Sequence, residues 1–432
     1  MTDFEELRTE IPGPRSRELA ATLRRYESQN VTYVSRDLPI FWSSAHGATV
    51  TDVDGNTYLD FTSAFGVAAV GHGNEAVADA IAAQAKTLGH GMGDVHPTDV
   101  RTRLLARLAA IAPVAQPKIF LCSTGAEAIE FAMKTAALAA GDFDLLAFGG
   151  AYHGLSYGAL EVCGIPKFRK PFEPQLRQNV LFAAYPRMSD RTPLDRVFKD
   201  IRKTLRRHRT IGGIIVEPIQ GRAGYVVPPE GFLRGLREIC TENDVLLILD
   251  EIYTGFGRTG AMFACEEEGV QPDLLCIGKA LGGGFPIAAV IGRAEVIDAW
   301  PESQGEALHT STFLGNPMGC AAALAVLDEF NKRSLVARAR RIGTIVGDRF
   351  AKIGLPALTT RGRGAMWAIE FANGELAAAT CLRALQRGLI VLQAGLTGSV
   401  LTISPPLITT DEQLYRGLAL LADAIRDVLL PA

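Results

Sequence analysis

Two ionisable residues, Asp250 and Lys279, stand at the ends of short apolar runs in the middle of the chain. Asp250 closes the run 245–249 (VLLIL), and Lys279 follows the run 274–277 (LLCI) after one glycine. Continuous apolar runs of this length are typical of strands buried on both faces of a parallel sheet, and ligands bind just beyond the carboxyl ends of such strands. We therefore expect both side chains to face one crevice.

The chemistry that this pair supports is that of a Schiff base. Lys279 lies between apolar residues and the glycine-rich segment 281–284 (LGGG), a poor setting for a solvated amine. Partial burial lowers the pKa of an amine and favours the free base, which attacks carbonyl groups. A carboxylate such as Asp250 can hold a pyridinium nitrogen protonated, which keeps the ring an electron sink. Each residue alone equally fits a structural role, as a loop cap or a lysine that extends past a strand end, but the pair indicates a pyridoxal phosphate site.

The segments around both residues resemble a family signature. LDEIYTGFGRTG at 249–260 and PDLLCIGKALGGGFPIAAV at 272–290 are similar to sequences of class III (subgroup II) pyridoxal phosphate aminotransferases, which have the fold type I architecture. The similarity extends from about residue 13 to residue 407. It implies an α/β protein with a mainly parallel sheet in a large domain and a small α+β domain.

The expected domain boundaries follow the chain. Residues 1–62 are predicted to form an N-terminal arm and strands of the small domain, 63–328 the large cofactor-binding domain, and 329–432 the C-terminal small domain. Alternating apolar and polar residues around the turn Asp54-Gly55-Asn56 predict a β-hairpin. From residue 117 strands and helices alternate, as a doubly wound sheet requires. Strands are predicted at 145–148 and 211–216, and helices at 75–88, 233–242, 318–330, 335–353 and 411–430.

Composition narrows the class of protein. With 432 residues, 48% hydrophobic, the chain is long enough for a large buried core, and its net charge of −3 gives no sign of a partner such as nucleic acid or an anionic membrane. The basic run 199–209 (KDIRKTLRRHR) is predicted to be the solvated face of a helix. The polar N-terminus resembles no targeting signal, and no apolar run reaches the ~18 residues of a membrane span, so we expect a soluble, cytoplasmic enzyme. Seven cysteines without a CxxC pair predict free thiols, with neither disulfides nor a metal site.

A small-residue turn precedes the helix predicted within 118–136. Thr124, Gly125 and Ala126 stand where the first free N–H groups of that helix open, and the helix dipole attracts an anion there. From the residues alone, a plain helix cap explains the turn as well as a phosphate cradle does. The resemblance implies that the turn holds the cofactor phosphate.

Further cofactor contacts are implied by the resemblance. It places Tyr152 flat on the pyridine ring with His153 beside it, and Ile252 on the opposite face of the ring. Glu217, directly after the strand 211–216, would lie near the ring hydroxyl and act with Asp250 and Lys279 in catalysis. Tyr253 stands where many relatives have a glutamine.

The segment 309–317 (HTSTFLGNP) is similar to the T-x-x-G-N-P segment of the family. There the hydroxyl of the threonine, Thr312 in this chain, reaches the cofactor phosphate of the partner subunit. The resemblance thus implies a homodimer, alone or as the unit of a larger oligomer. Without the resemblance, the segment is a helix-capping loop.

The substrate side departs from relatives that act on 4-aminobutyrate, ornithine derivatives and 2-oxoglutarate. Where those have an arginine, a gating glutamate and a second arginine, this chain has Leu155, Arg222 and Thr402. A dicarboxylate acceptor needs a second charged anchor. Arg222 either replaces the missing anchors or is an exposed loop charge. Phe65 lies in the wall of the substrate pocket by resemblance, and is equally explained as a core residue from sequence alone.

These observations predict an ω-type aminotransferase that works by a ping-pong mechanism. Its donor would be an amine or amino acid with a largely apolar or neutral tail, and its acceptor a small keto acid such as pyruvate. The freed amine of Lys279 would shuttle a proton between substrate and cofactor. The same cofactor residues also serve aminomutases, amino-acid epimerases and decarboxylases. A non-catalytic pyridoxal phosphate-binding protein is disfavoured, because Lys279, Asp250 and Glu217 are all present.

Overall fold

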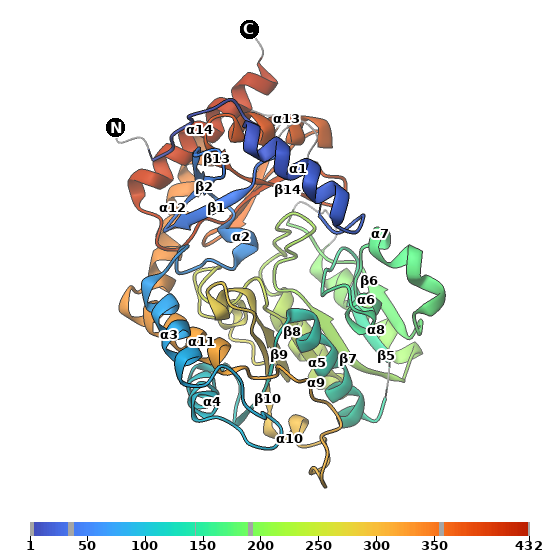
Figure 1. Cartoon of the computed structure of the whole chain (residues 1–432). Coiled ribbons are helices and arrows are strands. Elements are labelled where there is room, and N and C mark those ends of the chain that lie inside the picture. The colour runs from blue at the N-terminus through green and yellow to red at the C-terminus, as the bar shows by residue number, and fades with distance from the viewer. Residues whose placement is uncertain (1–3, 33–38, 143, 189–192, 354–357, 431–432) are drawn as a thin grey trace.

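The computed structural model describes residues 4–32, 39–142, 144–188, 193–353 and 358–430. Its elements form two groups in space, with the first strands of the chain lying beside its last helices (Figure 1). The group that contains both ends of the chain comprises α1 (Pro14–Tyr26), β1 (Trp42–His46), β2 (Thr49–Asp52), β3 (Thr57–Asp60), α12 (Leu335–Ile353), β11 (Thr359–Arg363), β12 (Met366–Glu370), α13 (Gly374–Leu385), β13 (Leu389–Ile390), β14 (Leu392–Ala394), β15 (Val400–Ile403) and α14 (Asp411–Leu429).

The middle of the chain forms the second group, built around one sheet. Its strands are β4 (Pro117–Cys122), β5 (Asp144–Phe148), β6 (Val180–Ala183), β7 (Ile211–Val216), β8 (Leu246–Asp250), β9 (Leu274–Ile277) and β10 (Ala288–Arg293). Its helices are α2 (Ser63–Gly66), α3 (Glu75–Thr87), α4 (Asp99–Ile111), α5 (Gly125–Ala140), α6 (Tyr157–Glu161), α7 (Pro166–Arg169), α8 (Leu194–Arg207), α9 (Phe232–Asn243), α10 (Ala294–Ile297) and α11 (Pro317–Lys332), with short 3₁₀ turns η1 (Lys170–Gln175), η2 (Ala264–Glu268) and η3 (Lys279–Gly282).

The central sheet has the strand order β4-β10-β9-β8-β7-β5-β6. The five strands from β9 to β6 pair in parallel, as the continuous apolar runs predict. β10 is antiparallel to both β4 and β9, a strand that the sequence analysis did not predict. The sheet is therefore mainly, but not wholly, parallel.

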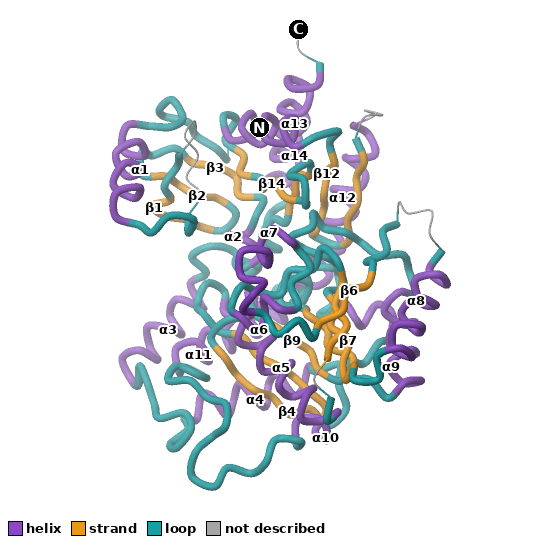
Figure 2. Tube along the Cα trace, turned by 90° about the vertical axis from the view of Figure 1, so that its right-hand side faces the viewer, coloured by secondary structure: helices purple, strands orange, loops and turns teal. Residues whose placement is uncertain are grey.

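Both faces of this sheet are buried under helices. Along β7 the side chains alternate, so that Ile214 and Val216 pack on one side and Ile215 on the other. The first side is covered by α8 and α9, and the second by α5; Figure 2 shows these helices around the central strands. In α8 the buried residues recur every fourth position and leave the basic residues outside, which confirms the predicted solvated face.

The N-terminal hairpin and the end of the chain share a sheet. β2 and β3 form the predicted hairpin, and β13 pairs in parallel with β3. A third sheet has the strand order β11-β12-β15-β14. The domain boundaries at residues 62 and 328 stay a prediction. All seven cysteines are free thiols, as predicted.

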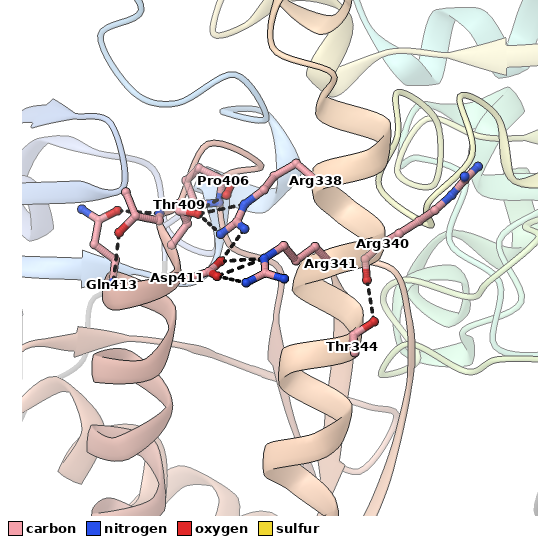
Figure 3. Close-up of polar contacts among 9 residues, drawn as sticks. Arg338, Arg340, Arg341, Thr344, Pro406, Thr409, Asp411 and Gln413 are labelled. Atoms are coloured by element: carbon pink, nitrogen blue, oxygen red, sulfur yellow. Dashed lines mark hydrogen bonds and ion pairs between the residues drawn. The ribbon is translucent and has the colours of Figure 1, made fainter.

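Two arginines fix the segment that follows β15. Arg338 and Arg341 on α12 both bind the carboxylate of Asp411 at the start of α14, and Arg338 also donates to the carbonyl of Thr409 (Figure 3). The negative charge of Asp411 also interacts favourably with the helix dipole at the N-terminus of α14. These contacts tie the segment between β15 and α14 to α12. Across the described ranges, no helix is both long and apolar enough to span a bilayer.

Candidate active site

Four adjacent strands deliver the ionisable residues to one cavity of about 780 Å³. Lys279 follows β9 after one residue, Asp250 ends β8, and Glu217 directly follows β7. Tyr152 and His153 lie in the loop after β5. Because these strands are parallel, their carboxyl ends meet at one edge of the sheet. We call Lys279, Asp250, Glu217 and His153 the floor of the cavity.

Asp250 is buried and forms one hydrogen bond through each of its oxygens. One of its oxygens pairs with Nδ1 of His153 at 2.7 Å, and the other accepts the N–H of Ile252 at 3.0 Å. Burial alone would lower the pKa of His153, but the hydrogen bond and charge of Asp250, with a contribution from Glu217, outweigh it and raise that pKa. The contact with Asp250 thus favours the imidazolium form of His153.

Glu217 links two loops of the site. Its Oε1 accepts the N–H of Tyr152 at 2.8 Å and its Oε2 the N–H of Gly221 at 2.9 Å. Burial raises the pKa of Glu217 to about 7; the charge of His153 lowers it and that of Asp250 raises it. The side chain therefore positions Tyr152 as well as contributing charge.

Lys279 adopts an unusual backbone conformation. Its φ of +42° lies in the left-handed region, which costs free energy for any residue with a Cβ. Burial lowers the pKa of its amine, partly offset by the charges of Asp250 and Glu217. Lowering that pKa favours the free amine that Schiff-base formation requires.

The N-terminus of α5 borders the same cavity. Thr124 is its N-cap and forms a capping box with Glu127, while its own side chain is exposed and does not line the cavity. Gly125 and Ala126 do line it, and their N–H groups are the first of the helix, without intrahelical acceptors. A Cβ on Gly125 would lie 2.9 Å from Cδ1 of Ile252, so glycine is needed for this close packing. The turn is thus a helix cap that also presents two N–H donors to the cavity.

Phe65 lies at the mouth of the cavity, 59% exposed. It belongs to a left-handed turn, since the φ angles of residues 63–66 are +49°, +48°, +61° and +84°. Asp60 accepts two hydrogen bonds from Thr62, and the hydroxyl of Ser63 donates to the carbonyl of Ser404 at 2.6 Å. These contacts hold a turn that only glycine adopts without strain.

The other substrate-side residues lie on the same edge. Leu155 and Arg222 are exposed and Thr402 is buried, and all three line the cavity. The hydroxyl of Thr402 donates to the carbonyl of Leu392. Within the described ranges Arg222 forms no ion pair with a carboxylate, so its guanidinium is available at the entrance. We call Phe65, Leu155 and Arg222 the rim.

Thr312 lies apart from these residues. It is exposed in the loop before α11 and does not line the cavity of its own chain.

Several residues of the site were missed by the sequence analysis. Phe168 lines the cavity and packs edge-on against Tyr152, with ring centroids 5.7 Å apart. Tyr225 and Ser404 hydrogen-bond to Tyr253, and the buried Arg258 donates to the carbonyls of Ser404 and Pro405. Arg258 within the quoted signature could have been singled out, because an arginine between apolar segments needs buried acceptors. The other three residues carry no distinct signal.

The cavity matches pyridoxal phosphate in three respects. It offers an amine of lowered pKa in Lys279, a buried carboxylate in Asp250, and two N–H donors at a helix N-terminus. Nε2 of His153 is buried with no partner among the described residues, which leaves a polar atom for further hydrogen bonding in this region. The donor set therefore fits the group.

Comparisons with known proteins agree with this geometry. The family profile of "Aminotransferase class-III" matches residues 31–425. The 4-aminobutyrate aminotransferase of Mycobacterium leprae (strain TN) is 35% identical, with 99% of this chain and 100% of the relative covered.

Two solved structures have nearly the same fold. An (S)-enantioselective omega-transaminase from Thermomicrobium roseum superposes with a TM-score of 0.89 at 27% identity, covering 96% of this chain and 99% of the other. An ornithine aminotransferase from Toxoplasma gondii, described with partial occupancy of PLP at its active site, gives 0.86 at 29% identity and covers 96% and 94%. The chain therefore belongs to the class III aminotransferases, and it is a pyridoxal-phosphate-dependent enzyme of fold type I.

Proposed function

We propose that this aminotransferase accepts an amine or amino acid with a largely apolar or neutral tail and passes the amino group to a small keto acid such as pyruvate. The observation that carries the proposal is a group of apolar side chains in the wall of the cavity away from the floor. Val31, Phe65, Leu155, Phe168 and Leu392 line the cavity, and Arg222 is the arginine in its lining among the described residues.

The charge balance of this wall disfavours a dicarboxylate. An ionised carboxylate that leaves water without a partner is costly, and a bidentate arginine is the partner that best compensates that cost. Arg222 can bind one carboxylate. The second carboxylate of a substrate such as 2-oxoglutarate would face Leu155 or Thr402, whose hydroxyl is already donated to Leu392.

In the proposed mechanism Lys279 would hold the cofactor, and the N–H groups of Gly125 and Ala126 would hold its phosphate. Pyridoxal phosphate supplies the carbonyl that takes up the amine and the ring that withdraws electrons. Asp250 would pair with the ring nitrogen of the cofactor, Tyr152 and Ile252 would pack against the ring, and Glu217 would lie near its hydroxyl. The amine of Lys279 would accept a proton from the substrate carbon and give it up again.

We also propose a homodimer in which Thr312 reaches the phosphate of the partner's cofactor. Thr312 lies in the same loop as Leu308 and Phe313, which are 73% and 62% exposed, and an interface here would cover both apolar side chains. Light scattering should give at least twice the chain mass of 46.3 kDa. A monomer would contradict the proposal.

The substrate proposal is tested with purified holoenzyme and a panel of amines and amino acids, without an acceptor. Conversion of the visible absorbance band to the shorter-wavelength band of the aminated cofactor identifies donors. Pyruvate and 2-oxoglutarate are then compared as acceptors. Better turnover of 4-aminobutyrate with 2-oxoglutarate than with pyruvate would overturn the proposed substrate class.

A further inference from the structure

Tyr253 lies in the wall of the cavity, and Lys279 rests against its ring. The Nζ of Lys279 is 4.5 Å from the ring centroid. The face of an aromatic ring is the negative part of its quadrupole and attracts an ammonium group. The two nearby carboxylates have other partners, since Asp250 pairs with His153 and Glu217 accepts two backbone N–H groups. The ring is therefore a direct contact for positive charge on Lys279.

Two glycines let the backbone approach this ring closely. A Cβ on Gly66 would lie 3.2 Å from Cε1 and Cζ of Tyr253, and one on Gly221 would lie 3.6 Å from Cδ2. Gly66 is the last residue of the left-handed turn at the rim. The ring is thus packed between two loop backbones and the lysine, which leaves it little room to rotate.

The phenol oxygen of Tyr253 begins a chain of hydroxyl groups. It lies 2.6 Å from the hydroxyl oxygen of Tyr225 and 3.2 Å from Oγ of Ser404. The hydroxyl of Tyr225 donates to Oγ of Ser404 at 3.0 Å, and Ser404 donates to the carbonyl of Thr62 at 3.3 Å.

Each hydroxyl group has one proton to donate, and this fixes the direction of the hydrogen bonds along the chain of hydroxyl groups. The carbonyl of Thr62 can only accept, so it takes the proton of Ser404, and Ser404 takes that of Tyr225. The 2.6 Å contact must then be donated by Tyr253 to Tyr225. Tyr225 is buried and has a left-handed backbone, with φ of +48°, so its hydroxyl is held in place. In this arrangement each of the three hydroxyl groups donates one hydrogen bond.

From this geometry we propose that Tyr253 is a positioning residue for Lys279. Its ring face holds the lysine nitrogen and stabilises it in the protonated form, and the chain through Tyr225 to Ser404 fixes the ring. The proposal rests on the cofactor-binding role proposed above for Lys279. Tyr253 would thus influence the basicity of Lys279 from the wall of the cavity, independently of the carboxylates on the floor.

The test is a pH titration of the visible absorbance of the holoenzyme, which reports protonation of the Lys279 nitrogen bonded to the cofactor. Tyr253→Leu removes the ring, and Tyr253→Phe removes only the hydroxyl. A cation–π contact of ordinary strength corresponds to a shift of about one pH unit. We expect Tyr253→Leu to lower the midpoint by that amount, because the protonated form loses its partner, and Tyr253→Phe and Tyr225→Phe to lower it by less than half as much.

Tyr58→Phe is the matched control, because Tyr58 is a buried tyrosine of the N-terminal hairpin whose hydroxyl donates to Asp52. Its midpoint should equal that of the wild type. An unchanged midpoint in Tyr253→Leu would overturn the proposal, as would equal shifts in Tyr253→Leu and Tyr253→Phe, which would assign the effect to the hydroxyl. A visible band that persists in Lys279→Ala would instead overturn the role of Lys279.

Discussion

The floor of the cavity comes from the ends of four adjacent strands, whereas the rim is held by contacts such as that between Ser63 and Ser404, which are 341 positions apart. The carboxylates of the floor are buried and hydrogen-bonded on both oxygens. At the rim, Phe65 and Arg222 are exposed. The parallel sheet thus positions the residues of the proposed cofactor site, while loops supply the proposed substrate side. Changes to the floor should abolish turnover, and changes to the rim should alter selectivity.

The largest effect is expected from Asp250→Asn. A neutral amide cannot hold a pyridinium nitrogen protonated, so kcat/KM for any good donor should fall by roughly 10³-fold. The visible absorbance should still show bound cofactor. Steady-state kinetics with saturating acceptor measures this loss.

Asp273→Asn provides the control for that variant. Asp273 is equally buried but lies before β9, at the opposite end of the strand from the cavity, where it binds Arg237 and Arg293. Its loss should lower the thermal midpoint and leave kcat/KM within a few-fold of wild type. Similar losses of kcat/KM in both variants would show that Asp250 acts only through stability.

Glu217 makes stability depend on pH. Its pKa is about 7 in the folded protein, above the 4.5 that is usual for glutamate, so the folded state binds this proton more tightly than the unfolded state. The resulting stabilisation is full below pH 4.5 and is lost as pH rises through 7, and it corresponds to about 3 kcal/mol.

The variant Glu217→Gln has no titratable group at this position. The variant should therefore gain stability relative to wild type as pH rises from 4.5 to 7, as measured by urea unfolding. Glu238→Gln, at an exposed position on α9, should show no such trend. A constant difference between Glu217→Gln and wild type would refute the raised pKa.

Three groups of the floor could be predicted from sequence because each follows an apolar run, and the run and the group are neighbours in the chain, whereas His153 was supplied by the resemblance. Predicting the position of Asp250, Lys279 and Glu217 required no knowledge of long-range contacts beyond the parallel pairing of the strands. The antiparallel strand β10 was missed because antiparallel and parallel buried strands share one residue pattern.

The rim could be predicted only in part. The resemblance supplied Phe65 and pointed to Arg222, but not the left-handed turn that presents Phe65, because alanine and phenylalanine give no signal for positive φ. Tyr225 follows β7 and Ser404 follows β15, and both meet Tyr253 through long-range packing that no local pattern encodes.

A smaller effect is expected from Arg222→Ala. If the guanidinium binds the carboxylate of the keto acid, its removal should raise KM for pyruvate roughly 10-fold, since a hydrogen bond to a charged group contributes about 1.5–3 kcal/mol. KM for an amine donor without a carboxylate should change less than about two-fold. Arg222→Lys keeps the charge but not the bidentate geometry, so its KM for pyruvate should lie between those of wild type and Arg222→Ala. Equal KM values for pyruvate in wild type and Arg222→Ala would identify Arg222 as a loop charge.

The smallest effect concerns the strained turn of the rim. Ala64 has φ of +48° and ψ of +60°, a conformation that costs alanine about 1 kcal/mol more than glycine. Ala64→Gly should therefore raise the free energy of unfolding by up to about 1 kcal/mol, whereas Ala82→Gly, at an exposed position within α3, should lower it by a similar amount. If the strain serves to position Phe65, the stabilised variant should also discriminate less between bulky and small amines, because glycine frees the turn that presents the ring. A variant that gains stability with unchanged selectivity would show that the hydrogen bonds of Thr62 and Ser63 alone position Phe65.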